Sequence, residues 1–273
     1  MHTFELKSSD FDKISRLVYE QCGIHLHEGK KELVKARLSK RLRAGNYNSF
    51  SDYYRYVTTQ EGQDELIAMI DSISTNLTSF FREESHFVRL RRIIEGLISK
   101  SGHRKINFRI WSAGCSTGEE PYTLAITLRE AAGHYPFDAS ILATDISTKV
   151  LRIAETGVYA RDRVKAIAVP LLKKYFQMGT GKSEGQVRVK SDLKAMVNFQ
   201  RFNLMENFPD QNHFDVIFCR NVMIYFDKKT QNVLVNKFHN ALKSGGYFFV
   251  GHSESLTGLK HPFNYVEPSV YLK

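Results

Sequence analysis

A glycine-rich turn followed by two carboxylates could bind a ligand that carries no phosphate. The segment 111–121 reads WSAGCSTGEEP, so Glu119 and Glu120 open a predicted helix directly after the second glycine. A helix N-terminus binds phosphate through free N–H groups and a positive dipole end, and two carboxylates there would repel it. NAD and ATP are therefore poor candidates. S-adenosylmethionine, with a sulfonium and a ribose diol, fits the acids better, although acids in a first turn also serve simply to stabilise the helix dipole.

A third acid ends the next predicted strand. Asp145 closes the run ASILATD (139–145), one strand–helix unit after the glycine loop. Doubly wound sheets place a carboxylate at this point on the ribose hydroxyls of a nucleotide, whereas the alternative role of such an aspartate is to cap the next helix. Together with the glycine loop, Asp145 favours a nucleoside-type cofactor.

The elements that must position these acids follow from a change of pattern along the chain. The first hundred residues are mainly helical, with helices expected near 10–22, 30–43, 49–59 and 62–74. From about residue 106, short apolar runs alternate with helical stretches, which predicts a parallel, doubly wound α/β sheet. The expected strands are 106–113, 139–145, 213–219 and 245–251, and the expected helices begin at Pro121 and cover 150–155 and 229–242.

Two further runs are unlike buried parallel strands. QVRVK (186–190) alternates apolar with basic residues, so we place it in a small antiparallel insertion, and MVNFQRF (196–202) also differs from the buried strands. The preceding GTGKSEG (179–185) resembles the end of a phosphate-binding loop, but Phe176 stands where that loop needs its leading glycine. We therefore expect a glycine-rich hairpin tip.

Composition and charge narrow the functional class. With 42% hydrophobic and 25% charged residues, the chain is typical of a folded globular protein and not of a disordered one. No run approaches the ~18 apolar residues of a membrane span, and the N-terminus carries acids where a signal peptide needs basic and apolar residues, so we expect a cytoplasmic protein. A net charge of +10 favours an anionic partner: nucleic acid, lipid or an acidic protein surface.

Metal and disulfide chemistry find little support. Cys22, Cys115 and Cys219 lie far apart and form no C-x-x-C pair. His25 and His27 lack the spacing of metal ligands and have no recognisable acidic partner. We expect neither a disulfide nor a metal site.

Half of the net charge lies in one predicted helix. The segment 28–43 carries seven basic and two acidic residues. Its apolar residues Val34, Leu38 and Leu42 form one stripe, while a separate face carries Lys30, Arg37 and Arg41. A charged helix face is usually only solvated, but this concentration of charge favours a partner.

Several segments together resemble the CheR family of chemotaxis-receptor glutamate methyltransferases, over nearly the whole chain and in the family's order. They are NLTSFFRE (76–83), AGCSTGEEPY (113–122), ILATDIS (141–147), FDVIFCRNVMIYFD (214–227) and GHSESL (251–256). The resemblance implies an all-helical N-terminal domain over 1–75 and a linker over 76–90 that contributes to the cofactor site. It further implies a Rossmann-like S-adenosylmethionine domain over 91–273, into which a small antiparallel β-subdomain is inserted at about 172–195.

The resemblance also implies roles for individual residues. Arg82 and Tyr225 are implied to lie nearest the transferred methyl; taken alone, each would be read as a structural residue. A glutamate substrate, with a free pKa of about 4.3, is already ionised, so the protein needs to orient it and exclude water and needs no strong base. An arginine fork suits this task. The implied cofactor contacts are Asn76, Thr78, Arg82, Glu119, Asp145, Asn203, Leu204, Arg220 and Asn221.

The implied substrate is a cytoplasmic receptor bundle with clustered glutamates, which would dock on the basic helix through Lys30, Arg37 and Arg41. Some family members also bind a pentapeptide at the receptor C-terminus through the hairpin, which can accept a peptide along an exposed strand edge. Met178 stands where those members carry a basic residue. We expect a monomer that binds no nucleic acid and does not insert into a membrane. The hairpin residues expected to contribute are Gly179, Gly181, Gly185 and Arg188.

Two other functions remain open on the residues alone. A nucleic-acid methyltransferase would explain the positive charge, but adenine-amino methyltransferases carry an N/D-P-P-Y/F motif where this chain reads RNVMIY (220–225), without the diproline. A non-catalytic binding module on the same fold is disfavoured by the retention of the implied site residues. A methyl-transfer assay separates both alternatives from the enzyme.

Overall fold

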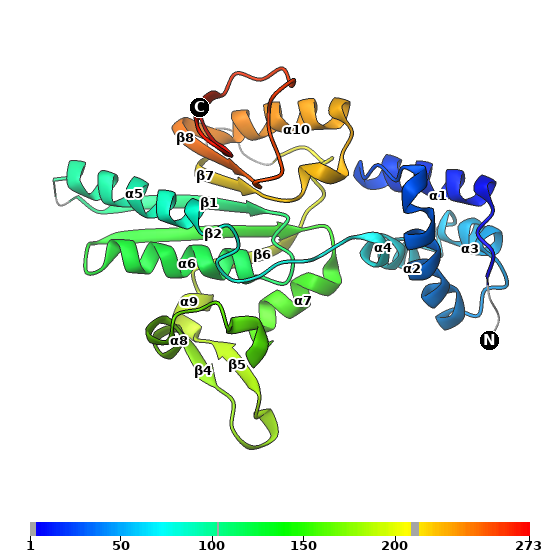
Figure 1. Ribbon diagram of the computed structural model, residues 1–273, viewed down its shortest axis with the longest axis horizontal. Helices are drawn as coiled ribbons and strands as arrows, with labels where there is room; N and C mark the ends of the chain where they lie inside the picture. The colour runs from blue at the N-terminus through cyan, green and yellow to red at the C-terminus, as the bar shows by residue number, and fades with distance from the viewer. Residues whose placement is uncertain (1–3, 103, 209–212) are drawn as a thin grey trace. The chain divides into compact units, whose positions relative to one another are not determined.

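The computed structural model describes residues 4–102, 104–208 and 213–273 (Figure 1). The chain divides into two compact units. The helical unit comprises Met1–Thr75 with Tyr225–Gln231, and the α/β unit comprises Asn76–Ile224 with Asn232–Lys273. Among the described residues, no helix has the length and apolar character needed to cross a bilayer.

Within residues 4–75, the helical unit contains the four helices that the sequence predicts. The stripe of Val34, Leu38 and Leu42 is fully buried, which confirms the expected apolar face of the second helix. Ser49 caps the third helix by accepting a hydrogen bond from the Asp52 N–H group at 3.0 Å. The helices are α1 (Ser8–Cys22), α2 (Lys31–Ala44), α3 (Phe50–Val57) and α4 (Gln63–Ile73), with a 3₁₀ turn, η1 (Glu28–Lys30), before α2.

A seven-stranded sheet forms the centre of the α/β unit, in the order β6-β2-β1-β7-β8-β10-β9 (Figure 1). The first five strands in this order run parallel, and β10 pairs antiparallel with β8 and β9. The predicted doubly wound parallel sheet is confirmed. The strands are β1 (Ile106–Ala113), β2 (Phe137–Asp145), β6 (Val197–Arg201), β7 (Phe214–Cys219), β8 (Leu242–Val250), β9 (Asn264–Glu267) and β10 (Val270–Leu272).

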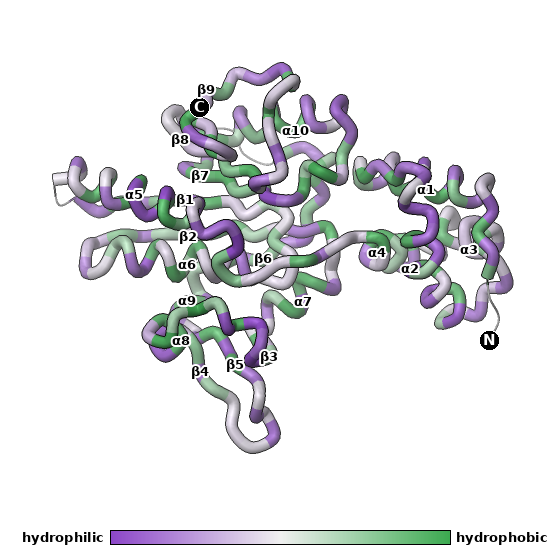
Figure 2. The backbone as a smooth tube through the Cα atoms, viewed as in Figure 1, coloured by the Kyte–Doolittle hydropathy of each residue, from purple (hydrophilic) through white to green (hydrophobic). Residues whose placement is uncertain are grey.

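Helices cover both faces of this sheet, so successive strand residues enter different cores. Ile110 and Phe249 lie in the core shared with α5 (Ser85–Lys100) and α6 (Glu119–Ala132). On the opposite face, the rings of Trp111 and Phe248 pack against Phe238 of α10 (Lys228–Ala241) at 5.4 and 5.1 Å. The central strand β7, drawn mostly in green in Figure 2, is accordingly apolar along most of its length.

A small antiparallel sheet is inserted between β2 and β6, in the order β3-β5-β4. The expected hairpin at QVRVK is confirmed, but the sheet also includes β3, which lies before the expected range 172–195. The inserted elements are α7 (Thr148–Thr156), β3 (Val158–Ala160), η2 (Arg161–Val164), α8 (Val169–Tyr175), β4 (Phe176–Met178), η3 (Gly181–Ser183), β5 (Gln186–Val189) and α9 (Ser191–Lys194).

The run 196–202 differs from the buried parallel strands, as expected, although it belongs to the same sheet. The run MVNFQRF contains β6, which pairs in parallel with β2 in the main sheet. Because β6 is an edge strand, Asn198 and Gln200 are exposed while Val197 and Phe199 are only half-buried. Its polarity therefore does not resemble that of a strand covered on both faces.

Candidate functional site

The glycine loop after β1 is too tight for side chains. Gly114 and Gly118 have φ angles of +84° and +95°, which favour glycine, and a Cβ on Gly118 would lie 2.9 Å from the Ala154 Cβ. The N–H groups of Gly114 and Cys115 both donate to the Thr144 carbonyl at 2.8 Å. The loop is thereby fixed against the end of β2.

Asp145 lies beside this loop, as predicted. Its carboxylate accepts from the Ser116 N–H at 2.8 Å and from the Ser147 N–H at 2.9 Å. The cap of α7 is Ser147, whose Oγ accepts from the Val150 N–H, so Asp145 is not the N-cap. The geometry thus favours the cofactor role over the alternative.

The two loop carboxylates are each paired with an arginine. Glu119 is fully buried and forms an ion pair with Arg163 of η2. Glu120 accepts from Arg220 Nη1 at 3.1 Å and from Ser112 Oγ at 2.7 Å. Burial raises the pKa of the Glu120 carboxyl, and Arg220 opposes this shift. Because each carboxylate is paired with an arginine, the two would repel a phosphate less strongly than the sequence indicates.

The 76–84 linker is fastened to the α/β unit through its backbone. The Asn76 carbonyl accepts from Ser116 Oγ at 3.0 Å, and the Phe81 N–H donates to Thr123 Oγ1 at 3.2 Å. Phe81 and Glu83 adopt φ angles of +55° and +59°, which side chains rarely tolerate. Strained backbone of this kind persists only where surrounding contacts hold it.

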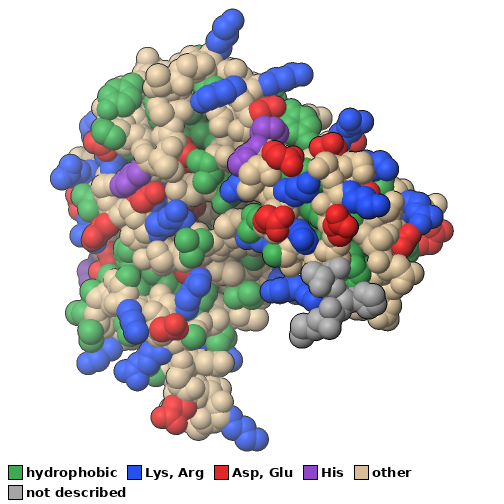
Figure 3. All heavy atoms as spheres, turned by 45° about the vertical axis from the view of Figure 1, so that its right-hand side comes forward, with side chains coloured by type: hydrophobic (Ala, Val, Ile, Leu, Met, Phe, Trp, Pro, Cys, Tyr) green, Lys and Arg blue, Asp and Glu red, His purple; other side chains and the backbone are tan. Residues whose placement is uncertain are grey.

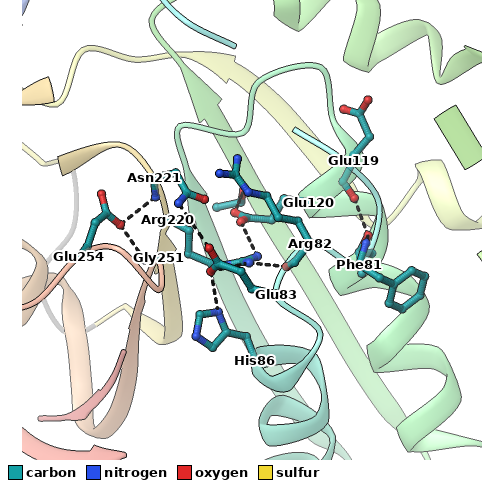
Figure 4. Close-up of polar contacts among 12 residues, drawn as sticks. Phe81, Arg82, Glu83, His86, Glu119, Glu120, Arg220, Asn221, Gly251 and Glu254 are labelled. Atoms are coloured by element: carbon teal, nitrogen blue, oxygen red, sulfur yellow. Dashed lines mark hydrogen bonds and ion pairs between the residues drawn. The ribbon is translucent and has the colours of Figure 1, made fainter. Parts of the chain in front are cut away.

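Arg220 provides much of that support (Figure 4). Its side chain is 2% exposed, and the guanidinium donates to Glu83 Oε2 at 2.9 Å, to the Arg82 carbonyl and to Glu120. All three guanidinium nitrogens are engaged, so Arg220 joins the end of β7 to the linker and to the start of α6. Its predicted direct contact with the cofactor stays a prediction.

Arg82 keeps hydrogen-bonding capacity for a ligand. Its Nη1 donates to the Leu77 carbonyl at 2.8 Å, while its Nε and Nη2 have no partner among the described residues. The Thr78 carbonyl, four residues earlier, lies 3.5 Å from Arg163 Nη2. Thr78 thus lies close to the arginine that pairs with Glu119.

The other predicted cofactor contacts also follow strand ends. Asn221 comes just after β7, with its side-chain amide 3.4 Å from Glu83 Oε1. Asn203 and Leu204 follow β6; Asn203 Oδ1 accepts from the Met205 N–H at 3.0 Å. The glycine loop and Asp145 follow β1 and β2, so the sheet brings these residues to one carboxyl edge, where doubly wound folds bind ligands.

Tyr225 belongs to the helical unit and Arg82 to the α/β unit. Within the helical unit, the Tyr225 carbonyl accepts from the His25 N–H at 2.8 Å. The pairing of the Arg82 and Tyr225 side chains stays a prediction.

Two of the expected docking residues on α2 are engaged inside the helical unit. Arg37 donates to the carbonyls of Ile73 and Ser74, and Arg41 forms an ion pair with Glu65. Lys30 is half-buried. Figure 3 shows the Lys and Arg side chains of this unit interspersed with acidic ones. Arg37 and Arg41 are therefore less available to a partner than the sequence suggests, and their docking role stays a prediction.

The hairpin has the predicted form. The Gly179 N–H donates to the Gln186 carbonyl at 2.9 Å, and Gly181 and Gly185 adopt positive φ angles. Arg188 is exposed on β5, which is paired on both sides by β3 and β4. An added peptide strand would have to use the edge of β3 or β4.

Four residues that contact the predicted site were given no role from the sequence: Glu83, Arg163, Lys237 and Glu254. Lys237 Nζ donates to the carbonyls of residues 204–206, at 2.9 to 3.4 Å. Glu83 and Glu254 lie in the NLTSFFRE and GHSESL segments, which could have drawn attention to them. Arg163 lies in a short 3₁₀ helix without any motif, so no sequence signal identified it.

Glu83, His86 and His252 form a group whose potential ligand atoms lie within 4.8 Å of one another. Arg220 already places a positive charge on Glu83. Burial and Arg220 lower the pKa of His86 to about 3, so this imidazole is neutral. We assign no ion to this cluster.

Family models match both parts of the chain. The model described as "CheR methyltransferase, all-alpha domain" matches residues 9–74, and "CheR methyltransferase, SAM binding domain" matches residues 76–272. The cofactor is therefore S-adenosylmethionine, and the carboxylate beside the glycine loop fits its ribose diol.

Relatives are similar over nearly the whole chain. A chemotaxis protein methyltransferase of Borreliella burgdorferi is 43% identical over 98% of this chain and 95% of the relative. Chemotaxis protein methyltransferase 2 of Pseudomonas aeruginosa is 41% identical, covering 98% and 94%, and the Escherichia coli chemotaxis protein methyltransferase is 39% identical, covering 97% and 91%. The chain therefore belongs to the CheR family of S-adenosylmethionine-dependent methyltransferases.

Proposed function

We propose that this protein transfers a methyl group from S-adenosylmethionine to glutamate side chains of chemotaxis receptors, forming glutamate methyl esters. The names of the relatives support a chemotaxis substrate. The observation that carries the proposal is the position of Arg82, on a linker fastened beside the cofactor loop and with two guanidinium nitrogens free for a ligand.

The protein's chemical task is small. The cofactor supplies an electrophilic methyl group, and the glutamate carboxylate is already ionised at neutral pH. Arg82 would hold that carboxylate in line, and a hydroxyl such as that of Tyr225 would complete the orientation. Arg82 must not bind the substrate more tightly than the transition state, because only preferential binding of the transition state accelerates the reaction.

Asp145 is the best-supported acceptor for the ribose hydroxyls. It ends β2 beside the glycine loop and keeps 7% of its surface exposed. Glu119 is fully buried and paired with Arg163, so its first role is to fix the loop. Asn76, Thr78, Asn203, Leu204 and Asn221 would complete the cofactor contacts.

We place receptor docking on α2 and on the hairpin. Lys40 and Arg43 of α2 are exposed and have no partner among the described residues, so they replace Arg37 and Arg41 as the cations available to a glutamate-rich bundle. A receptor tail peptide would add to an edge of the small sheet. In this proposal the enzyme acts as a cytoplasmic monomer.

The test is methyl transfer from labelled S-adenosylmethionine to receptor-containing membranes. We expect label that mild base releases as methanol, and an about 100-fold lower rate for Arg82→Ala, since misplacing the carboxylate removes the in-line geometry. Arg152→Ala removes an exposed arginine of α7 and is the matched control, expected to keep the wild-type rate. Wild-type protein that binds cofactor but transfers no base-labile label would contradict the proposal.

A further inference from the structure

A buried carboxylate joins the loops that follow β7 and β8 (Figure 4). Glu254 is 8% exposed. Its Oε2 accepts from the N–H groups of Asn221, at 2.8 Å, and Gly251, at 2.6 Å. Its Oε1 accepts from the Ile224 N–H at 3.2 Å. One side chain therefore satisfies backbone donors at both ends of the 220–224 loop.

The 220–224 loop depends on these hydrogen bonds. Asn221 has a φ of +58°, which costs energy for a residue with a side chain. The loop also runs close to the end of β8, because a Cβ on Gly251 would lie 2.9 Å from the Asn221 nitrogen. Without the carboxylate, the buried N–H group of Gly251 and the partly buried N–H group of Asn221 would lose this partner, which is unfavourable.

We infer that Glu254 is a positioning residue for methyl transfer. It holds the 220–224 loop in the conformation that presents Asn221 and that leads into Tyr225, the first residue after the loop. This inference rests on the proposed function, in which Asn221 contacts the cofactor and Tyr225 lies near the methyl group. Glu254 itself would touch neither the cofactor nor the substrate, because its carboxylate oxygens are directed at backbone N–H groups.

The experiment compares Glu254→Gln with wild type and with Glu267→Gln. Glutamine keeps the shape but replaces one accepting oxygen by an NH₂ group, which faces a backbone donor and cannot accept from it. Glu267 is the control because its side chain is 39% exposed. Its ion pair with Arg89 lies at the surface and is long, at 3.6 Å. We expect kcat of Glu254→Gln to fall about tenfold with the receptor KM nearly unchanged, because orientation rather than substrate binding is lost.

A double variant separates positioning from general destabilisation. If Glu254 acts through the loop that presents Tyr225, Tyr225→Phe combined with Glu254→Gln should fall no more than about threefold below the slower single variant. A double variant whose loss of rate equals the product of the two single losses would overturn the inference. So would a Glu254→Gln rate within about twofold of wild type.

If Glu254→Gln does not fold, Glu254→Asp serves in its place. It keeps the charge on a side chain one methylene shorter, with the same expected losses and the same contradicting results. Wild-type protein is measured beside the variants in each experiment. If the wild type does not methylate receptors, the proposed function is contradicted. If the wild type is active and the Glu254 variant is equally active, only the inference about Glu254 is contradicted.

Discussion

At the scale of single residues, the buried guanidinium of Arg220 holds the linker and the start of α6 together through ion pairs. It is nearly inaccessible, yet it carries a charge that two carboxylates, Glu83 and Glu120, balance from different elements. Burial raises the pKa of Glu83, but the Arg220 hydrogen bond and charge outweigh it and hold that pKa below its ordinary value. The linker conformation and the buried charges are therefore one interdependent set.

Removing this cation should strongly destabilise the α/β unit. Arg220→Met leaves Glu83 and Glu120 buried without their partner, and we expect a loss of about 3–5 kcal/mol in the free energy of unfolding, measured with urea. The control Lys105→Met breaks an exposed pair, in which Lys105 lies 3.2 Å from Asp138, and should cost about 0–1 kcal/mol. Equal losses in the two variants would show that the Arg220 network does not stabilise the fold.

The lowered pKa of His86 makes the free energy of unfolding depend on pH. Its pKa is lowered to about 3 in the folded protein from 6.5, so between these values the unfolded chain binds the extra proton. Stability should thus fall as pH drops below about 6.5, by up to about 1.4 kcal/mol per pH unit for this group. His86→Phe, which suits neighbours such as Phe249, should flatten the slope of unfolding free energy between about pH 6.5 and 5. An unchanged slope would contradict this.

At the scale of elements, hydrophobic periodicity predicted most of the architecture. The helices of the helical unit and the parallel strands around β1 agree with their expected ranges because their apolar faces are fully buried. Periodicity did not assign β6 to the main sheet, because its edge position leaves polar residues exposed. The glycine loop after β1 was predictable because its positive φ angles need glycine. Asp145 was predictable because it ends a strand of the parallel sheet.

Side-chain pairing could not be predicted from the sequence. Helical spacing placed Arg37 and Arg41 on one face, but it could not show that the end of α4 and Glu65 would engage them. The pairing of Glu119 with Arg163 depends likewise on tertiary contact across 44 residues. Charge counting therefore identified the basic helix but not its available cations.

The exposed end of α2 gives a test of docking. Lys40→Glu combined with Arg43→Glu should raise the receptor KM and weaken its dependence on salt, because exposed charges mainly govern encounter. The melting temperature should stay within about 2 °C, since neither side chain has a partner to lose. Arg41→Met is the comparison, and it should instead lower the melting temperature because it breaks the pair with Glu65. An unchanged KM in the double variant would refute docking on this surface.

At the scale of the whole molecule, the helical unit is built from two separate stretches of the chain. Tyr225–Gln231 belongs to it, although these residues follow the β7 loop in sequence. Tyr19 donates to Asp227 Oδ2 at 2.9 Å, and Ile24 forms a β-bridge with Phe226, so the end of α1 holds this segment.

In the proposed reaction, the methyl group ends on a receptor glutamate as an ester. The most direct measurement is mass spectrometry of receptor peptides after incubation with S-adenosylmethionine and enzyme, before and after mild base. We predict that glutamate-containing peptides gain the mass of one methyl group and lose it in base, and that Arg82→Ala slows the gain about 100-fold. Methyl groups that resist base, or that are found on nucleic acid and not on receptor peptides, would contradict the assignment.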